Sequence, residues 1–224
     1  MERPLDQDLA QIRESLLEMG GLVEQMIATA TRALVDRDRE AAKEVIVVDR
    51  AVDRLEKEID EACHSVLVRR QPAAVDLRLL IAVMKITADL ERMGDSAVNI
   101  AQATISLNEE PLLKPYVDLP KMSQKVQEMV RSSLDAFVRR DAELALTVCR
   151  GDDEIDTLYR RLFDELMEMM VADRNAVRRA VHLLLIARNL ERIADHATNI
   201  GEDVIYYVEG FDIRHRAGEE QAKS

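Results

Sequence analysis

Apolar residues recur along most of the chain at alternating intervals of three and four, as in the run Leu9, Ile12, Leu16, Met19 and Val23. This spacing places the apolar side chains on one narrow stripe of an α-helix, which is typical of helices that pack side by side. The pattern predicts six long helical stretches, which cover approximately residues 5–33, 48–66, 79–107, 122–137, 155–169 and 183–204. We therefore expect an all-α protein.

Helix breakers separate these stretches. Asp38 and Asp141 are suited to cap the helices that follow them, and Pro72 suits the first turn of the third helix, where its missing N–H costs nothing. The proline-rich segment Asn108–Pro120 is predicted to be a linker. The expected organisation is a first three-helix bundle over 1–107, the linker over 108–120, a second bundle over 121–210 and a flexible tail over 211–224.

An internal repeat relates the two halves. The stretch LERMGDSAVNIA at 90–101 returns as LERIADHATNIG at 190–201, one hundred positions later. Upstream the displacement is three residues longer, so the second copy has lost three residues in the loop that corresponds to Pro72. The repeat predicts two antiparallel three-helix bundles in tandem.

Composition narrows the function. One third of the 224 residues are charged and only 3% are aromatic, which is typical of packed helices. The net charge of −12 disfavours nucleic acid and anionic membrane surfaces as partners. No apolar run is long enough to cross a bilayer, so we expect a cytoplasmic protein without direct membrane insertion. Cys63 and Cys149 stand alone and are expected to be small core residues.

Acidic residues form four pairs at a spacing of four, which places both carboxylates of a pair on one helix face. Two carboxylates so placed repel each other unless something offsets the repulsion. The pairs are Asp49 with Asp53 and Glu91 with Asp95 in the first half, and Asp152 with Asp156 and Glu191 with Asp195 in the second.

The helix register brings these pairs together. In an antiparallel hairpin, opposed residues have a constant sum of residue numbers, and Asp49 with Asp95 gives the same sum as Asp53 with Glu91. That sum centres the turn on Pro72. The second half gives the same result with a turn between Asp173 and Arg174, so four carboxylates are predicted to meet in each bundle.

Four carboxylates at one place suit a hard cation such as Mg, Mn, Ca, Fe or Zn, and a quartet has enough oxygens for more than one ion. We therefore predict a multinuclear metal cluster in each repeat. The alternative is a set of ordinary ion pairs on the helix surface. Those pairs would be Asp53 with Lys57, Arg92 with Asp95, Arg188 with Glu191 and Arg192 with Asp195.

Other candidate sites are weaker. Glu61 and His64 match half of a di-iron motif, but no second copy is present. His196 corresponds to Ser96 in the first copy and is expected to be incidental, or to lie beside the ligands. Gly94 is expected to let a neighbouring helix approach the acidic site. No catalytic triad, nucleophilic cysteine with a base, or phosphate-binding loop occurs, so an enzyme is not expected.

These features together resemble the PhoU family of phosphate-uptake regulators. The resemblance covers the whole chain and is carried by DRAVD and DDEID, by the repeated LER motifs and by VIYYVEGFDIRH near the end. It implies multinuclear clusters of iron or zinc on the eight acidic residues, with manganese or magnesium as further options. It also implies a negative regulator that links a phosphate ABC transporter to a sensor histidine kinase and its response regulator.

The resemblance further implies recruitment to the inner face of the membrane through the transporter ATPase, and we expect a homodimer. One other function remains open, a metal-dependent hydrolase of phosphate esters, because paired metals can activate water. Such an enzyme would need an acid or base beyond the metal ligands, and the sequence offers none. We favour the regulator.

Overall fold

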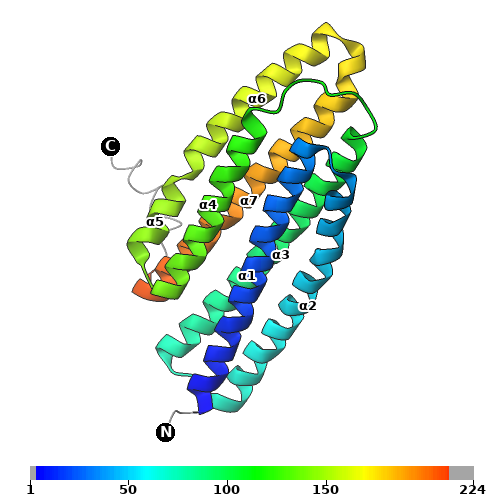
Figure 1. Ribbon diagram of the computed structural model, residues 1–224. Helices are drawn as coiled ribbons and strands as arrows, with labels where there is room; N and C mark the ends of the chain where they lie inside the picture. The colour runs from blue at the N-terminus through cyan, green and yellow to red at the C-terminus, as the bar shows by residue number, and fades with distance from the viewer. Residues whose placement is uncertain (1–3, 212–224) are drawn as a thin grey trace, which may run out of the picture.

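The computed structural model describes residues 4–211, and α-helices make up most of them (Figure 1). No strand occurs within this range. The helices are α1 (Pro4–Asp36), α2 (Arg39–Arg70), α3 (Ala74–Leu107), α4 (Asp118–Arg139), α5 (Ala142–Arg150), α6 (Asp152–Ala172) and α7 (Val177–Glu209), with a 3₁₀ turn η1 (Arg174–Ala176) before α7. The predicted all-α fold is confirmed.

Each half of the chain folds as a bundle. Helices α1, α2 and α3 pack on one another, and α4, α5, α6 and α7 form the second bundle beside them (Figure 1). Both predicted caps form: the Asp38 carboxylate accepts hydrogen bonds from the Glu40 and Ala41 amides at 2.9 and 3.0 Å, and Asp141 accepts one from the Leu144 amide at 2.9 Å.

The structure differs from the sequence prediction at three boundaries. The middle helix of the second bundle is interrupted at Gly151, which separates α5 from α6. Pro72 lies in the connector before α3 and not in its first turn, because Ala73 is the N-cap. The expected linker is shorter, since its last three residues already belong to α4. Residues 212–224 of the expected tail lie outside the described range.

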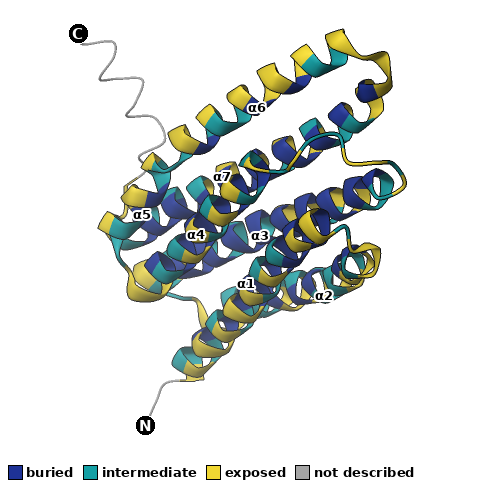
Figure 2. Cartoon of the chain, turned by 45° about the horizontal axis from the view of Figure 1, so that its top comes forward, coloured by how far each residue is buried: buried dark blue, intermediate teal, exposed yellow. Residues whose placement is uncertain are grey.

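One hydrophobic core runs through both bundles. The apolar stripes that the sequence predicted are buried along α1, α3, α4 and α7, whereas α6 buries only Ile155, Leu162 and Leu166 and exposes its outer side (Figure 2). Helix α1 remains unbroken at Gly20 because α4 packs there: a Cβ on Gly20 would lie 2.5 Å from Leu134 Cδ1. A glycine at this position thus allows close contact between α1 and α4.

Helices α3 and α7 join the two halves. Lys85 pairs with Asp203 at 2.8 Å, and the Asn99 amide donates to the Asn189 side-chain oxygen at 3.3 Å. The residue numbers in each pair have the same sum, so the two helices are antiparallel and in register. In the described part of the chain, no helix combines the length and the apolar character that a membrane crossing requires.

Candidate metal centres

The first acidic quartet lies across the hairpin of α2 and α3. Asp49 and Asp53 lie on α2, and Glu91 and Asp95 lie on α3, in the register that the sequence predicted. Asp49 is close enough to Asp53 and Asp95 to be affected by their charges, and Glu91 is affected by Asp95 and Asp53. The four carboxylates therefore lie close enough for their charges to affect one another.

Gly94 makes room for this arrangement. A Cβ built on Gly94 would lie 3.3 Å from Asp49 Oδ1 and 3.5 Å from Val52 Cγ1. Even the smallest side chain at this position would crowd the carboxylate on the facing helix. The absence of a side chain thus allows α2 to pack closely against α3 at the level of the quartet, as expected from the sequence.

The charges of the first quartet are only partly balanced, because Arg92 lowers the pKa of Glu91 through its charge without forming an ion pair with it. Burial raises the pKa of Asp49 to about 6, with further contributions from Asp53 and Asp95. Burial and then Asp95 also raise the pKa of Glu91. Within the described range, no Lys or Arg forms an ion pair with these four carboxylates, so the predicted pairs of Asp53 with Lys57 and of Asp95 with Arg92 do not form.

The second quartet repeats this arrangement between α6 and α7. Asp152 and Asp156 lie on the first two turns of α6, and Glu191 and Asp195 face them from α7. Burial raises the pKa of Asp152 to about 6, and the charges of Asp195 and Asp156 add to the effect. Burial is also the main cause of the raised pKa values of Glu191 and Asp195, although Arg188 opposes the shift in both.

Arginines compensate part of the charge in the second quartet. Arg188 forms a hydrogen-bonded ion pair with Glu191, and Arg160 pairs with Asp156 at 2.8 Å. The alternative of surface ion pairs is thus correct for Arg188 with Glu191, but Arg192 forms no such bond with Asp195 in the described chain. Two oxygens of the quartet, Asp152 Oδ1 and Glu191 Oε2, are buried without a hydrogen-bond partner.

The four carboxylates of each quartet are suitable ligands for a hard cation, but their oxygens do not point towards one common position. Unpartnered buried carboxylate oxygens are costly, and a bound cation would satisfy them. However, nowhere in residues 4–211 do three His, Cys, Asp or Glu side chains gather in positions to ligate one ion. Coordination would therefore require the carboxylates to rotate towards each other. Metal binding at the two quartets stays a prediction.

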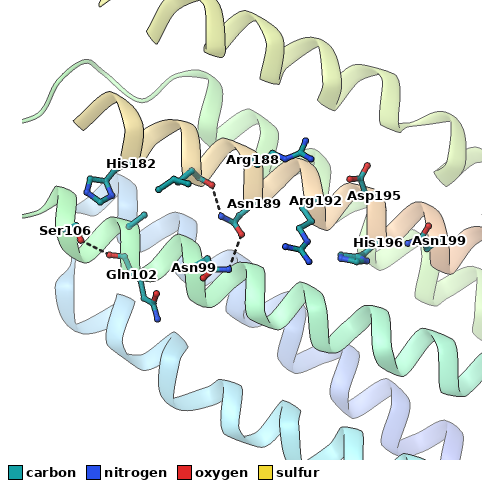
Figure 3. A pocket seen from close by; sticks show the side chains of 12 residues that line it. Asn99, Gln102, Ser106, His182, Arg188, Asn189, Arg192, Asp195, His196 and Asn199 are labelled. Atoms are coloured by element: carbon teal, nitrogen blue, oxygen red, sulfur yellow. Dashed lines mark hydrogen bonds between the residues drawn. The ribbon is translucent and has the colours of Figure 1, made fainter. Parts of the chain in front are cut away.

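A buried pair lies between the bundles: Asp89, to which the sequence assigned no role, and His196, which was expected to be incidental or to lie beside the ligands. Asp89 on α3 and His196 on α7 are both buried, and His196 Nδ1 lies 2.8 Å from Asp89 Oδ1. His196 also lines a cavity of about 820 Å³ between α3 and α7 (Figure 3). Asp89 interrupts an apolar stretch, and this was the available signal, but its partner lies in the other repeat.

The remaining candidates have no such setting. Glu61 and His64 are exposed on α2, as a solvated helix face would be. Cys63 is buried as expected, while Cys149 is half-buried, with Sγ 3.7 Å from the Thr198 carbonyl oxygen. Burial raises the pKa of both thiols, so neither is activated as a nucleophile.

Known proteins are similar to this chain in both sequence and fold. The PhoU domain model matches residues 16–104 and again residues 119–204. The phosphate-specific transport system accessory protein PhoU homolog of Pseudomonas aeruginosa is 44% identical over 93% of this chain and 86% of its own length. The PhoU accessory protein of Escherichia coli is 38% identical over 96% of this chain and 90% of its own length.

Solved structures agree with this relationship. The crystal structure of PhoU from Pseudomonas aeruginosa superposes with a TM-score of 0.90 at 43% identity, covering 92% of this chain and 99% of that one. The phosphate transport system regulatory protein PhoU from Streptococcus pneumoniae superposes with a TM-score of 0.86 at 31% identity, covering 93% and 99% of the two chains. With a family match in each half and relatives along nearly all of its length, the chain belongs to the PhoU family.

Proposed function

We propose that this protein is a metal-binding, non-enzymatic regulator of phosphate uptake. It acts as a negative regulator between a phosphate ABC transporter and a phosphate-responsive two-component system. Relatives that match nearly the whole chain are named as accessory proteins of the phosphate-specific transport system, which supports the pathway. The observation that carries the metal-binding part is the acidic quartet that recurs in register in both bundles.

The eight carboxylates of the two quartets would hold the metal. Asp49 and Asp53 would be joined to Glu91 and Asp95 in the first bundle, and Asp152 and Asp156 to Glu191 and Asp195 in the second. A bound cation supplies positive charge, which offsets both the burial and the mutual repulsion that raise the pKa values of Asp49 and Asp152. Iron or zinc is our first choice, with manganese or magnesium as further options.

Both quartets reach the protein surface. Asp95 and Asp195 are exposed, while Asp49 and Asp152 are half-buried. A metal-loaded quartet therefore presents an ordered surface to a partner, and this suits an adaptor. We propose the transporter ATPase and the sensor histidine kinase as partners at the inner face of the membrane, with the protein acting as a homodimer. The net charge of −12 disfavours nucleic acid as a partner.

Gene deletion tests the regulatory role. A strain that lacks the gene should keep its phosphate-starvation response switched on in abundant phosphate, and the wild-type gene should restore repression. A deletion strain that represses the response normally would contradict the proposal.

Asp95→Asn and Asp195→Asn test the contribution of the metal sites in the same strain. Both variants should impair repression, because each substitution removes the charge of a predicted metal ligand. The replacement has nearly the same size and the position is exposed, so the fold should not change. The matched control is Asp135→Asn, a surface substitution on α4 far from both quartets in sequence. If all three variants repress the response equally well, the predicted metal ligands are not needed for the regulatory role.

A further inference from the structure

The cavity between α3 and α7 is large enough for a small organic ligand. Its volume is about 820 Å³, which lies in the range of small-molecule sites and far exceeds what one oxyanion fills. Both halves of the chain contribute to its walls, which carry mostly amide, arginine and histidine side chains (Figure 3). Among the described residues that line it, Asp195 alone is acidic, so the cavity contrasts with a protein of net charge −12.

The internal repeat explains why this part of the seam is open. At the other end of the seam, Lys85 pairs with Asp203 at 2.8 Å and lies 5.9 Å from the centroid of the Tyr206 ring. The counterparts of these residues, one hundred positions away, all line the cavity and are Leu185, Ala103 and Ser106. An ion pair and a large ring fill one end, whereas uncharged residues without a ring leave the other end open.

Arg192 brings a positive charge to this cavity. Its side chain extends towards α3, whereas Asp195 points to the opposite side of α7 (Figure 3). The charge of Arg192 acts on Asp195, but Arg192 forms no hydrogen bond or ion pair with a described residue. Arg188, one turn away, is already paired with Glu191. A guanidinium carries five N–H donors, so Arg192 can bind a phosphate group through two parallel hydrogen bonds.

Gln102 brings a neutral donor and acceptor to the cavity. Its side chain is exposed, and its amide forms no hydrogen bond with a residue in the described part of the chain. An amide places an N–H donor beside an acceptor oxygen, which is the pattern that pairs with N7 and N6 of adenine. Guanine presents two acceptors at the same edge, so the amide oxygen would face O6 without a proton between them.

Apolar and flat side chains lie at the same end of the cavity as Gln102. Leu185 is 49% exposed although it is a large apolar residue, and the His182 ring lies one turn before it. Both line the cavity and offer surface on which a base can pack, since bases stack on apolar and aromatic side chains, histidine included. This end therefore suits a purine base better than a second charged group.

The distance between the two ends matches a nucleotide. In the register of α3 and α7, Gln102 lies opposite Ile186, six residues from Arg192, which corresponds to about 9 Å along the seam. A nucleoside monophosphate has a similar length from its phosphate to the outer edge of its base. Asn99 lies between these levels and donates to the Asn189 side-chain oxygen at 3.3 Å. Its second N–H and its own oxygen remain for the hydroxyl groups of a ribose.

We propose that this cavity binds a nucleoside monophosphate and prefers adenine as the base. The phosphate binds Arg192, the ribose lies beside Asn99, and the base pairs with Gln102 and packs on Leu185. One phosphate group is expected, because one of the two lining guanidinium groups is already paired and the net charge of −12 opposes further negative groups. This ligand site is independent of the predicted metal clusters.

Equilibrium dialysis of the full chain against radiolabelled AMP at pH 7.5 tests the proposal. Chelator-treated protein and zinc-loaded protein should both bind AMP, because neither Arg192 nor Gln102 is a predicted metal ligand. Unlabelled GMP should compete at least about fivefold less well than AMP, the lower bound for one bidentate base contact. Ribose 5-phosphate and adenosine, which each lack one end of the ligand, should compete at least about tenfold less well.

Three results would overturn the proposal. The first is absence of AMP binding at millimolar concentration. The second is equal competition by GMP or by ribose 5-phosphate, which would mean that the base is not recognised. The third is binding confined to the metal-loaded protein, which would place the nucleotide on a metal ion and not in this cavity.

Arg192→Gln tests the phosphate end. It removes the charge from an exposed side chain and should weaken AMP binding at least about tenfold. The matched control is Arg92→Gln, the counterpart in the first repeat, which does not line the cavity and should bind AMP as the wild type does. Similar losses in both variants would show that general charge, and not this site, attracts the nucleotide.

Gln102→Leu tests the base end. The substitution keeps a similar size at an exposed helical position, so helical circular dichroism should not change. It should weaken AMP binding at least about fivefold and abolish the preference for AMP over GMP. Gln25→Leu, at an exposed position of α1 that does not line the cavity, is the control and should keep both. A Gln102→Leu variant with the wild-type preference would contradict the role of this amide.

Discussion

The two acidic quartets have the same register but different surroundings. In the first bundle, α2 is one continuous helix, and Gly94 lets it pack closely against α3. In the second bundle, the corresponding helix is interrupted at Gly151, α6 buries few side chains, and Ala194 stands in place of Gly94. Arginines pair with two carboxylates of the second quartet and with none of the first in the described chain.

This difference suggests two ways to hold four carboxylates near one another: close packing of the two helices that carry them, or ion pairs with arginines. Tight packing holds the first quartet together against its own repulsion, whereas Arg188 relieves part of the repulsion in the second. In metal-free protein, the first quartet should therefore destabilise the fold more than the second does. A cation bound at the first quartet should then stabilise the fold more. The following predictions test this contrast.

Metal removal should have the largest effect. A ligand at one hundred times its dissociation constant stabilises the native state by about 2.7 kcal/mol. For a chain of this size, that corresponds to a fall in Tm of about 5–10 °C on chelation. The fall in Tm on chelation should be larger for Asp195→Asn, which leaves the first quartet intact, than for Asp95→Asn, which leaves the second quartet intact. Calorimetry of metal-loaded and chelated proteins, with metal analysis, checks this.

The double variant Asp95→Asn/Asp195→Asn is the control and should hardly respond to chelator. Wild-type protein that takes up no iron, zinc or manganese and melts at the same temperature with and without chelator would refute both metal sites. Equal responses of the two single variants would refute only the contrast between the quartets.

Removing Arg188 should make the second quartet resemble the first. Arg188→Gln leaves Glu191 buried without a cation, and we expect the chelated protein to lose about 1–2 kcal/mol of stability. Arg160→Gln is the control, because its pair with Asp156 is largely exposed and contributes less than about 1 kcal/mol. Urea unfolding at neutral pH measures both. If Arg160→Gln loses more stability than Arg188→Gln, then Arg160 and not Arg188 compensates more of the charge in the second quartet.

The pH dependence should be similar in the two quartets despite their different surroundings. Asp49 and Asp152 each have a pKa of about 6 in the folded protein, above the ordinary value of 3.8. The folded state therefore binds the proton more tightly than the unfolded state does, and stability is lost as pH rises from about 4 through 6.

Asp49→Asn and Asp152→Asn remove this loss in the chelated protein. Each variant should gain stability over the wild type between about pH 4 and 6, with the gain constant above that window and absent below it. Thermal melts across this range measure the gain. A gain that persists unchanged at the lowest pH would mean that the substitution acts through packing and not through charge.

The smallest effect on stability is expected at Gly94. Gly94→Ala improves helix propensity by about 1 kcal/mol, but its Cβ would crowd Asp49 Oδ1 at 3.3 Å. The two effects oppose each other, so the net change in unfolding free energy should stay below about 1 kcal/mol. Metal occupancy of the first quartet should fall, whereas Gly21→Ala, which meets no neighbour within 4 Å, should leave occupancy unchanged. Unaltered occupancy in Gly94→Ala would show that close packing is not needed.

Sequence periodicity predicted much of this structure because helices, caps and hairpin register depend on local spacing. The opposition of Asp49 to Asp95, and of Asp152 to Asp195, follows from the constant sum of residue numbers alone. The role of Gly94 was also predictable, because a small residue beside an acidic position in a packed helix indicates close approach.

The remaining features depend on contacts between distant segments. Gly151 followed by three acidic residues is a local signal for a helix boundary, but the apolar spacing resumes directly after it, so the pattern alone favoured one continuous helix. The pairing of Asp89 with His196 requires knowledge of how one repeat packs on the other, and the cavity beside it has the same origin. The partnership of Arg188 with Glu191 was one of several possible pairs, and side-chain packing decides among them.

The antiparallel pairing of α3 and α7 gives the two repeats an approximate two-fold symmetry. The register that opposes Lys85 to Asp203 and Asn99 to Asn189 also sets Gly94 opposite Ala194, and these two residues occupy the same position in their repeats. An isologous dimer interface has this property, because a residue near the axis faces its own copy. The chain thus has the geometry of a dimer of single repeats whose subunits are joined by residues 108–117. The two copies of a position still differ where the seam is asymmetric: His196, which lies 2.8 Å from Asp89, stands where the first repeat has Ser96.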